Sequence, residues 1–259
     1  MKIRKSILSL SLIMTLSFLV VGCAAKPKAE AVELNISAAA SLTEAMADLQ
    51  TEFKSTNPNI TLVTNFGSSG SLQQQIEQGA PCDVFISAGK SQMKALNDKG
   101  LLLDSTNKDL VKNELVLVGP KDTKITSISD LTTDKVKKIA VGEASSVPAG
   151  KYADEVFTKL NIKAAIQGKL VSAKDVKEVL AWATSGNADV GFAYLSDTVN
   201  NDSIKIIEQI SSDLHSPIIY PVGIIKSSTK ADSAKAFEDF LFTDKAQEIL
   251  KKYGYSSVN

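Results

Sequence analysis

Residues 34–58 run LNISAAASLTEAMADLQTEFKSTNP, and this stretch contains the patterns of one strand and one helix in succession. The short apolar run Leu34–Ala40 predicts a strand. From Leu42 to Phe53 the apolar side chains recur every three or four residues, as on one face of a helix, until Asn57-Pro58 ends the pattern. A strand that leads directly into a helix is the repeating unit of α/β proteins.

The same alternation continues along the rest of the chain. Further strands are expected at Ile60–Phe66, Asp83–Ser87, Leu115–Gly119, Lys138–Val141, Lys169–Val171, Val190–Ala193, Ile204–Ile207 and Pro221–Ile225. Further helices are expected at Ser71–Gln78, Ser91–Asn97, Tyr152–Leu160 and Val176–Ala183, with a final helix or helix pair between Phe237 and Leu250. Two such series in about 225 residues exceed one typical core. We therefore expect an α/β protein of two lobes, each a mainly parallel sheet flanked by helices.

The N-terminus has the order of a secretory signal. Three basic residues precede an apolar run from Ile7 to Val21, and Gly22-Cys23 follows. The end of this run resembles a lipobox, in which a cysteine is acylated before the signal is removed. We expect residues 1–22 to be a lipoprotein signal peptide, Cys23 the lipidation site and residues 23–31 a tether that anchors the protein to the extracytoplasmic face of the cell membrane. An ordinary signal peptide with an incidental cysteine is the alternative.

Charge and cysteine content exclude several classes of partner. Without residues 1–22 the chain has 26 basic and 29 acidic residues, a formal net charge of −3, which gives no indication of nucleic-acid binding. No arginine follows Arg4, which argues against a clamp for an organic carboxylate. Once Cys23 is acylated, Cys82 has no partner, so we expect a buried thiol, no disulfide, no multi-thiolate metal site and no cofactor.

Small or hydroxylated residues stand at four predicted helix starts, two in each half of the chain. They are Ser41, Ser68–Ser71, Val147–Gly150 and Lys174–Val176. A helix start offers unpaired N–H donors and the positive end of the helix dipole. Several starts that converge at the carboxyl edge of a sheet would bind an anion without any fixed positive charge. Taken singly, Ser41 and Ser71 have a simpler interpretation as helix caps.

Some segments of the sequence resemble enzyme motifs but lack a residue that each motif requires. Gly89-Lys90-Ser91 resembles the end of a phosphate-binding loop, but Val84 stands where its first glycine belongs. The segment 67–70, GSSG, lacks the Gly-x-Ser-x-Gly order of a nucleophile elbow. The single histidine, His215, is expected in an exposed loop without a catalytic partner. We predict that the protein is not an enzyme, with a serine hydrolase as the disfavoured alternative.

Seven ordered motifs carry a family resemblance. They are SAAASLT (37–43), NFGSSGSL (65–72), GAPCDVFISA (79–88), VPAGKYA (147–153), DV (175–176), GFAY (191–194) and YPV (220–222). Together they resemble the molybdate-binding protein family of ABC importers over nearly the whole mature chain, from about Val32 to Tyr255. Gly70 departs from the pattern, since many members have Ser or Thr there, and this departure is expected to loosen the second loop.

The resemblance implies a periplasmic-binding-protein type II fold, with two crossings between the lobes and a ligand cleft between them. Lobe 1 would comprise residues 32–114 and 226–259, and lobe 2 residues 115–225. The chain would act as a monomer outside the cytoplasm, held by its lipid anchor, and would deliver its ligand to the permease and ATPase of an ABC importer.

The resemblance also implies the ligand, molybdate or tungstate, and its contacts. Ser41 and Ser69 would donate hydroxyl and backbone N–H groups, Ala149 and Val176 backbone N–H groups, and Tyr194 its phenolic hydroxyl. All five would bind the oxyanion through hydrogen bonds, with no direct ligation of the metal. Sulfate and phosphate are the alternatives: sulfate is smaller, and protonated phosphate needs an acceptor, for which Asp175 is a candidate.

Overall fold

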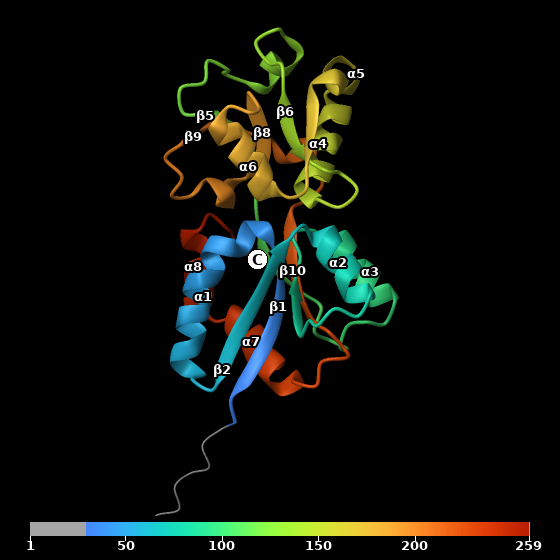
Figure 1. Ribbon diagram of the computed structural model, residues 1–259, viewed down its shortest axis with the longest axis vertical. Coiled ribbons are helices and arrows are strands. Elements are labelled where there is room, and N and C mark those ends of the chain that lie inside the picture. The colour runs from blue at the N-terminus through green and yellow to red at the C-terminus, as the bar shows by residue number, and fades with distance from the viewer. Residues whose placement is uncertain (1–29, 259) are drawn as a thin grey trace, which may run out of the picture. The chain divides into compact units, whose positions relative to one another are not determined.

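The computed structural model describes residues 30–258, and residues from Ala31 onward form one compact unit. This unit has two lobes, each built on a five-stranded sheet (Figure 1). The expected two-lobed α/β architecture is confirmed.

Lobe 1 contains the sheet β2-β1-β3-β10-β4. Its strands are β1 (Val32–Ala39), β2 (Ile60–Gly67), β3 (Val84–Ile86), β4 (Lys108–Lys112) and β10 (Ile219–Ile224). Its helices are α1 (Thr43–Thr56), α2 (Ser69–Glu77), α3 (Lys90–Asp98), α7 (Ala231–Leu241) and α8 (Asp244–Lys252), and a 3-10 turn, η1 (Ala40–Leu42), joins β1 to α1. Helices α1, α7 and α8 cover one face of the sheet, and α2 and α3 cover the other (Figure 1).

Lobe 2 contains the sheet β7-β6-β8-β5-β9. Its strands are β5 (Leu115–Pro120), β6 (Ile139–Gly142), β7 (Leu170–Ala173), β8 (Val190–Tyr194) and β9 (Ile204–Gln209). Its helices are α4 (Pro148–Lys159), α5 (Lys163–Ile166) and α6 (Val176–Ser185). Four 3-10 turns complete it: η2 (Ile128–Thr132), η3 (Gln167–Lys169), η4 (Leu195–Thr198) and η5 (Ser212–Leu214).

Both sheets combine parallel and antiparallel strand pairs in the same arrangement. In lobe 1, β1 pairs in parallel with β2 and β3, while β10 runs antiparallel to β3 and β4. In lobe 2, β6 pairs in parallel with β7 and β8, while β5 runs antiparallel to β8 and β9. Four strands of each sheet therefore point the same way, and the single reversed strand is the first one entered after a crossing between the lobes.

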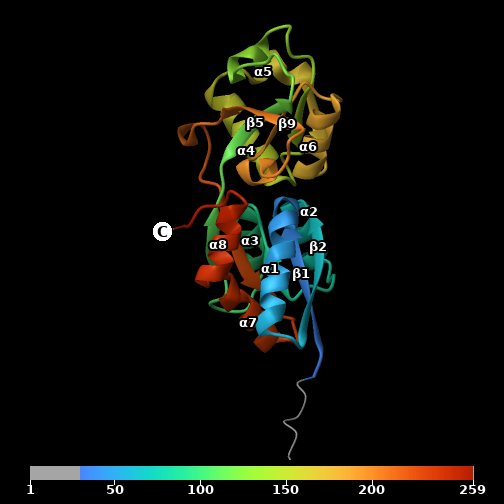
Figure 2. The ribbon, with the colours of Figure 1, turned by 90° about the vertical axis from the view of Figure 1, so that its left-hand side faces the viewer.

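The chain crosses between the lobes twice (Figure 2). The first crossing is Asn113-Glu114, between β4 and β5. The second lies between Gln209 of β9 and Ile219 of β10. Because β10 pairs with β3 and β4, residues 219–225 belong to lobe 1, and the expected boundary at 225/226 moves to the segment before Ile219.

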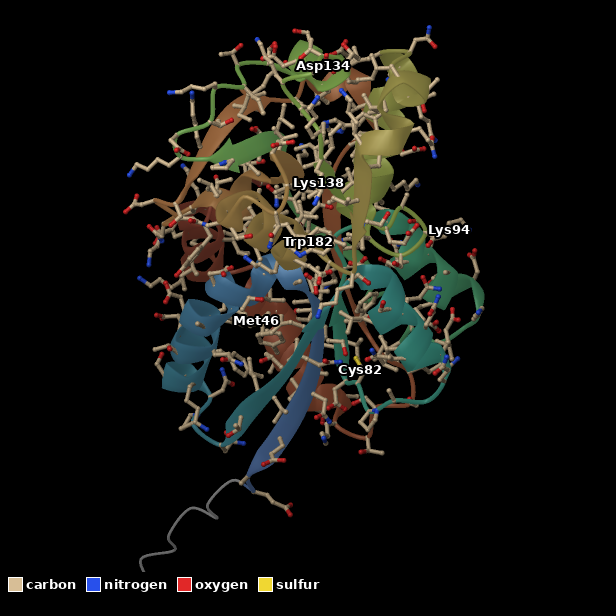
Figure 3. All side chains as sticks on the ribbon, turned by 45° about the horizontal axis from the view of Figure 1, so that its top comes forward. Met46, Cys82, Lys94, Asp134, Lys138 and Trp182 are labelled. Carbon is tan, nitrogen blue, oxygen red and sulfur yellow. The ribbon has the colours of Figure 1, made fainter. Side chains whose placement is uncertain are left out.

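The side chains sort by burial as the sequence pattern predicts. Helix α1 buries Ala45, Met46, Leu49 and Phe53 against the sheet. Figure 3 shows Lys94 and Asp134 on the outside of their lobes, while Cys82 lies within lobe 1. Burial raises the pKa of the Cys82 thiol to about 11, and its Sγ donates to the carbonyl of Val84, so this cysteine is a packed, unreactive group.

Two local expectations are wrong. Strand β4 was not expected, because its two apolar residues, Leu110 and Val111, are adjacent and show no alternation; this strand lies at the sheet edge, where pairing with β10 stabilises it. His215 is buried rather than exposed: its ring packs against Tyr152 with centroids 5.9 Å apart.

The expected signal peptide and the lipidation site at Cys23 lie outside the described residues. Within residues 30–258, none of the helices combines the length and hydrophobicity that a bilayer crossing requires.

Candidate functional site

One small cavity between the lobes is lined by all five residues that the sequence analysis singled out. Its volume is about 10 Å³, and it is bordered by Ala39, Ala40, Ser41, Gly67, Ser68, Ser69 and Ala88 of lobe 1 and by Val147, Pro148, Ala149, Val176 and Tyr194 of lobe 2. Pockets for organic ligands usually measure about 300–1,000 Å³, so this cavity suits a smaller ligand.

The lobe 1 wall is formed where β1 and β2 end and the following turn or helix begins. Ser41 lies in the middle of η1, and Ser69 is the first residue of α2. The cap of α2 is Ser68, whose Oγ accepts from the N–H of Ser71. Neither Ser41 nor Ser69 is therefore used as a helix cap, contrary to the simpler interpretation of Ser41.

The lobe 2 wall is formed by the first turns of α4 and α6. Pro148 occupies the first position of α4 and Ala149 the second, while Val176 begins α6. The first N–H groups of a helix have no intrahelical acceptor, so Ala149 and Val176 each bring a free donor to the cavity. A Cβ atom at Gly150 would lie only 1.9 Å from the carbonyl oxygen of Gly142, so glycine allows α4 to start this close to β6.

Tyr194 supplies the least satisfied polar group at the cavity. It ends β8 and is 1% exposed, and its hydroxyl has no hydrogen-bond partner among the described residues. Burial raises the pKa of this phenol well above 10, so the hydroxyl keeps its proton. A buried hydroxyl without a partner costs roughly 1–3 kcal/mol, and a ligand acceptor in the cavity would remove that cost.

The hydroxyl of Ser69 also has its proton free for a ligand. Its Oγ accepts from the N–H of Ala88 at 2.9 Å, and a backbone N–H can only donate. The Ser69 proton therefore has to be directed elsewhere, and the cavity is the space beside it.

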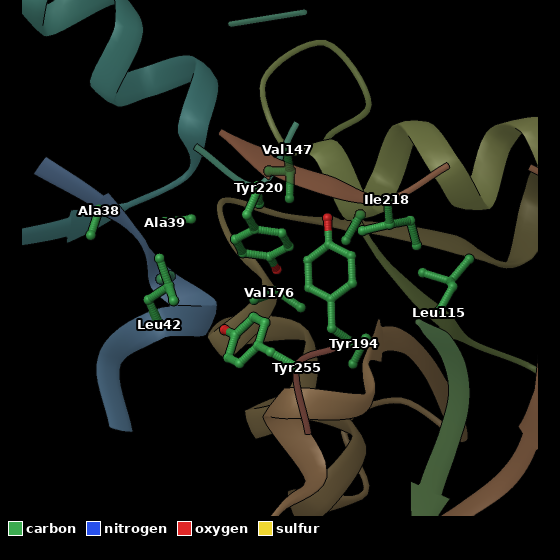
Figure 4. Close-up of a cluster of buried hydrophobic side chains, with 14 of the residues drawn as sticks. Ala38, Ala39, Leu42, Leu115, Val147, Val176, Tyr194, Ile218, Tyr220 and Tyr255 are labelled. Carbon is green, nitrogen blue, oxygen red and sulfur yellow. The ribbon is translucent and has the colours of Figure 1, made fainter. Parts of the chain in front are cut away.

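Further polar residues contact Ser41, and the sequence analysis did not identify them. The Oγ of Ser41 lies 2.8 Å from the hydroxyl of Tyr220, and the hydroxyl of Tyr255 donates to the Ser41 carbonyl at 2.9 Å. Figure 4 shows the rings of Tyr194, Tyr220 and Tyr255 together, and the ring centroids of Tyr220 lie 5.8 Å and 5.3 Å from those of the other two. Spacing in the sequence carries no signal for these contacts, because they join segments far apart in the chain.

In the described part of the chain, the residues that line the cavity carry no charged side chain. Asp175, the candidate acceptor for a protonated ligand, caps α6 by accepting from the N–H of Glu178 at 2.9 Å. Lys177 points instead to Asp197 and to Glu44 of lobe 1, at 3.0 Å and 2.6 Å. Burial disfavours its charged form, but these two carboxylates together raise its pKa above the ordinary value.

The arrangement offers hydrogen-bond donors and dipoles to a small, compact anion. It has no histidine or carboxylate in the lining that would activate a serine as nucleophile, as a hydrolase requires. His215 lines a different pocket, beside the crossings.

Comparisons with known proteins agree on one family. Residues 34–256 match the family described as bacterial extracellular solute-binding protein. YvgL of Bacillus subtilis strain 168, provisionally named an ABC transporter substrate-binding lipoprotein, is 39% identical over 94% of this chain and 95% of its own. The molybdate-binding protein ModA of Escherichia coli strain K12 is 38% identical over 93% of this chain and 94% of its own.

A solved structure matches as well. The substrate-binding domain of a provisionally assigned molybdenum ABC transporter from Clostridium difficile is 62% identical and has a TM-score of 0.70, covering 88% of this chain and all of that one.

Proposed function

Because the chain belongs to the bacterial extracellular solute-binding proteins, we propose that it captures molybdate or tungstate outside the cytoplasm and delivers it to an ABC importer. The observation that carries this proposal is the buried hydroxyl of Tyr194, which has no hydrogen-bond partner within residues 30–258, at a cavity lined by helix starts of both lobes. The names of two relatives, which refer to molybdate and molybdenum, support the choice of ion.

Burying a dianion requires that its lost hydrogen bonds with water be replaced. Ser41, Ser69 and Tyr194 supply hydroxyl donors, and Ala149 and Val176 supply N–H groups at the positive ends of helix dipoles. Dipoles bind the ion without a counter-ion, and this favours release at the transporter.

Size separates molybdate and tungstate from sulfate in this proposal. All three are tetrahedral dianions, but sulfate is smaller, so some of its oxygens would stay short of donors held on two rigid lobes. Each buried bond left unmade costs about 1–3 kcal/mol.

Phosphate is disfavoured for a different reason. Near neutral pH it carries a proton that needs an acceptor, and the cavity lining has no carboxylate since Asp175 is engaged as a helix cap. A thermal-shift measurement tests this. Molybdate or tungstate at 100 times its Kd should stabilise the folded protein by about 2.7 kcal/mol and so raise the melting temperature. Phosphate at the same concentration should leave the melting temperature unchanged. An equal shift with phosphate would contradict the proposal that the site offers hydrogen-bond donors and no acceptor for a proton.

The same proposal includes a lipid anchor at Cys23, a monomeric state, and a permease and ATPase as partners. The lipobox-like sequence before Cys23 and the lipoprotein name of the relative from Bacillus subtilis support the anchor. Replacing Cys23 by Ser should move the protein from the membrane fraction to the soluble one. Retention of the variant in membranes would argue for another anchor.

A further inference from the structure

We propose that Asn113 and Tyr220 orient the hydroxyl of Ser41 so that it donates its proton into the cavity. Asn113 lies in the first crossing between the lobes, and Tyr220 lies at the start of β10, directly after the second. All three side chains are buried. The inference rests on the proposed anion site and adds two positioning residues to it, neither of which lines the cavity.

The direction of the hydrogen bonds is set at Asn113. Its Oδ1 accepts from the N–H of Glu114 at 2.9 Å and from the N–H of Ser196 at 3.4 Å. Backbone N–H groups only donate, so the amide oxygen must face them and the Nδ2 must face the opposite way. The Nδ2 then donates to the hydroxyl oxygen of Ser196 at 2.8 Å and to that of Tyr220 at 3.2 Å.

The hydrogen bond from Asn113 in turn sets the direction of the hydrogen bond between Tyr220 and Ser41. Its oxygen accepts from Asn113 and lies 2.8 Å from the Oγ of Ser41. Because Asn113 donates to the Tyr220 oxygen, the Tyr220 proton needs an acceptor, and the Ser41 Oγ lies at hydrogen-bond distance from it. The reverse arrangement would turn the Tyr220 proton toward the neighbouring Tyr194, whose ring centroid lies 5.8 Å from that of Tyr220, and away from the Ser41 Oγ at 2.8 Å.

Ser41 is thereby left with its own proton to donate. Its Oγ accepts from Tyr220, and the remaining space beside it is the cavity. In the same way, the N–H of Ala88 donates to the Oγ of Ser69 and leaves the Ser69 proton for the cavity. In both serines a fixed donor occupies the oxygen, so both face the cavity as donors, and the Ser41 donor is controlled by the two segments that connect the lobes.

Two tyrosine hydroxyls beside Ser41 give a matched test. Tyr220→Phe removes the donor to Ser41 Oγ, whereas Tyr255→Phe removes the donor to the Ser41 carbonyl and leaves the relay intact. Both variants keep an aromatic ring in the same cluster. Calorimetric titration with molybdate should show a loss of affinity of about tenfold for Tyr220→Phe, the worth of one orienting hydrogen bond, and less than about twofold for Tyr255→Phe. Equal losses in the two variants would overturn the proposal.

A double-mutant cycle with Ser41→Ala separates positioning from a general effect on packing. If Tyr220 acts through the Ser41 hydroxyl, Tyr220→Phe should change affinity by less than about twofold once that hydroxyl is absent. A tenfold loss in both backgrounds would refute the relay. Asn113→Asp, measured with and without Ser41→Ala, is a second test in case Tyr220→Phe does not fold. The new carboxylate would accept the Tyr220 proton and draw it away from Ser41. The loss of molybdate affinity caused by Asn113→Asp should therefore be larger when the Ser41 hydroxyl is present.

The wild-type titration keeps the two proposals apart. No binding of molybdate by the wild-type protein would refute the proposed function, while tight wild-type binding with an unchanged Tyr220→Phe variant would refute the relay alone.

Discussion

At the scale of single residues, Tyr194 shows how the site differs from the rest of the core. Most buried hydroxyls beside it are paired, as those of Tyr220 and Tyr255 are. Within residues 30–258 the buried Tyr194 hydroxyl has no hydrogen-bond partner, although buried polar groups are nearly always hydrogen-bonded. The Tyr194 hydroxyl lowers the stability of the ligand-free protein, and this cost is explained if a ligand supplies the acceptor that the hydroxyl lacks.

Replacing Tyr194 by Phe should therefore have opposite effects on binding and on stability. Affinity for molybdate should fall by about 10- to 100-fold, because a hydrogen bond to a charged group is worth about 1.5–3 kcal/mol. The melting temperature of the ligand-free protein should stay the same or rise, since no protein hydrogen bond is lost. A variant that is less stable and binds normally would show that the hydroxyl has a structural partner instead.

The raised pKa of Tyr194 predicts how binding depends on alkaline pH. Burial stabilises the neutral phenol, so the donor is present below the ordinary pKa of about 10 and is lost only as pH passes the raised value. Affinity for molybdate at constant ionic strength should change by less than about twofold between pH 7 and pH 10.5. A fall of about fourfold, as expected for a tyrosine that titrates near 10, would contradict this assignment.

Sequence patterns lead to some of these residues and not to others. Ser69, Ala149 and Val176 stand at helix starts, where free donors are predictable from local sequence. Tyr194 came from the family resemblance. Tyr220 stands in the motif YPV, but its contact with Asn113 could not be predicted, because that hydrogen bond joins positions 107 apart and nothing local marks Asn113.

At the scale of elements, the site depends on where strands end and helices begin. Four strands of each sheet point the same way, so β1, β2, β6 and β8 bring the following turns and helices to the edges where the lobes face each other. The N-terminus of α2 meets lobe 2 directly: the N–H of Gly70 donates to the carbonyl of Ser146 at 2.8 Å. Gly70 thus makes a close contact between the lobes, rather than only loosening its loop.

Gly70→Ala tests whether this contact supports binding. An added Cβ would lie 2.6 Å from the carbonyl oxygen of Ser146 and 2.7 Å from its Cα, and backbone atoms cannot move aside as a side chain can. Because the added methyl group would hold the two lobes apart at this contact, molybdate binding should weaken by about 1–3 kcal/mol.

Gly168→Ala is the control for that change. Nothing lies within 4 Å of a Cβ atom there, so affinity should be unaffected. Equal affinities for Gly70→Ala and wild type would show that the lobes do not close in this way around the ligand.

Most elements were predictable because their periodicity is strong. Helix α1 and the buried strands follow the expected patterns within a few residues. Strand β4 and the short helix α5 were missed, since five and four residues carry too little periodicity to be distinguished from a loop.

At the scale of the whole molecule, the two lobes meet around the cavity and are joined by two crossings. Tyr220, Asn113 and Ser41 connect these crossings to the site, and Lys177 adds an ion pair to Glu44 across the lobes. The second crossing was misplaced by a few residues because the strand pattern of residues 219–225 does not reveal which sheet it joins. Strand pairing is a long-range property, and it decides the lobe boundary.

Above all, we propose that this cavity binds a tetrahedral oxyanion larger than sulfate. Isothermal titration calorimetry on the chain from Ala24 onward, which retains the whole compact unit, compares molybdate, tungstate and sulfate directly. Molybdate and tungstate should bind tightly and alike, and sulfate at least about 100-fold more weakly, as one or two unmade hydrogen bonds would require. A sulfate affinity equal to that of molybdate, or no binding of molybdate, would contradict the account.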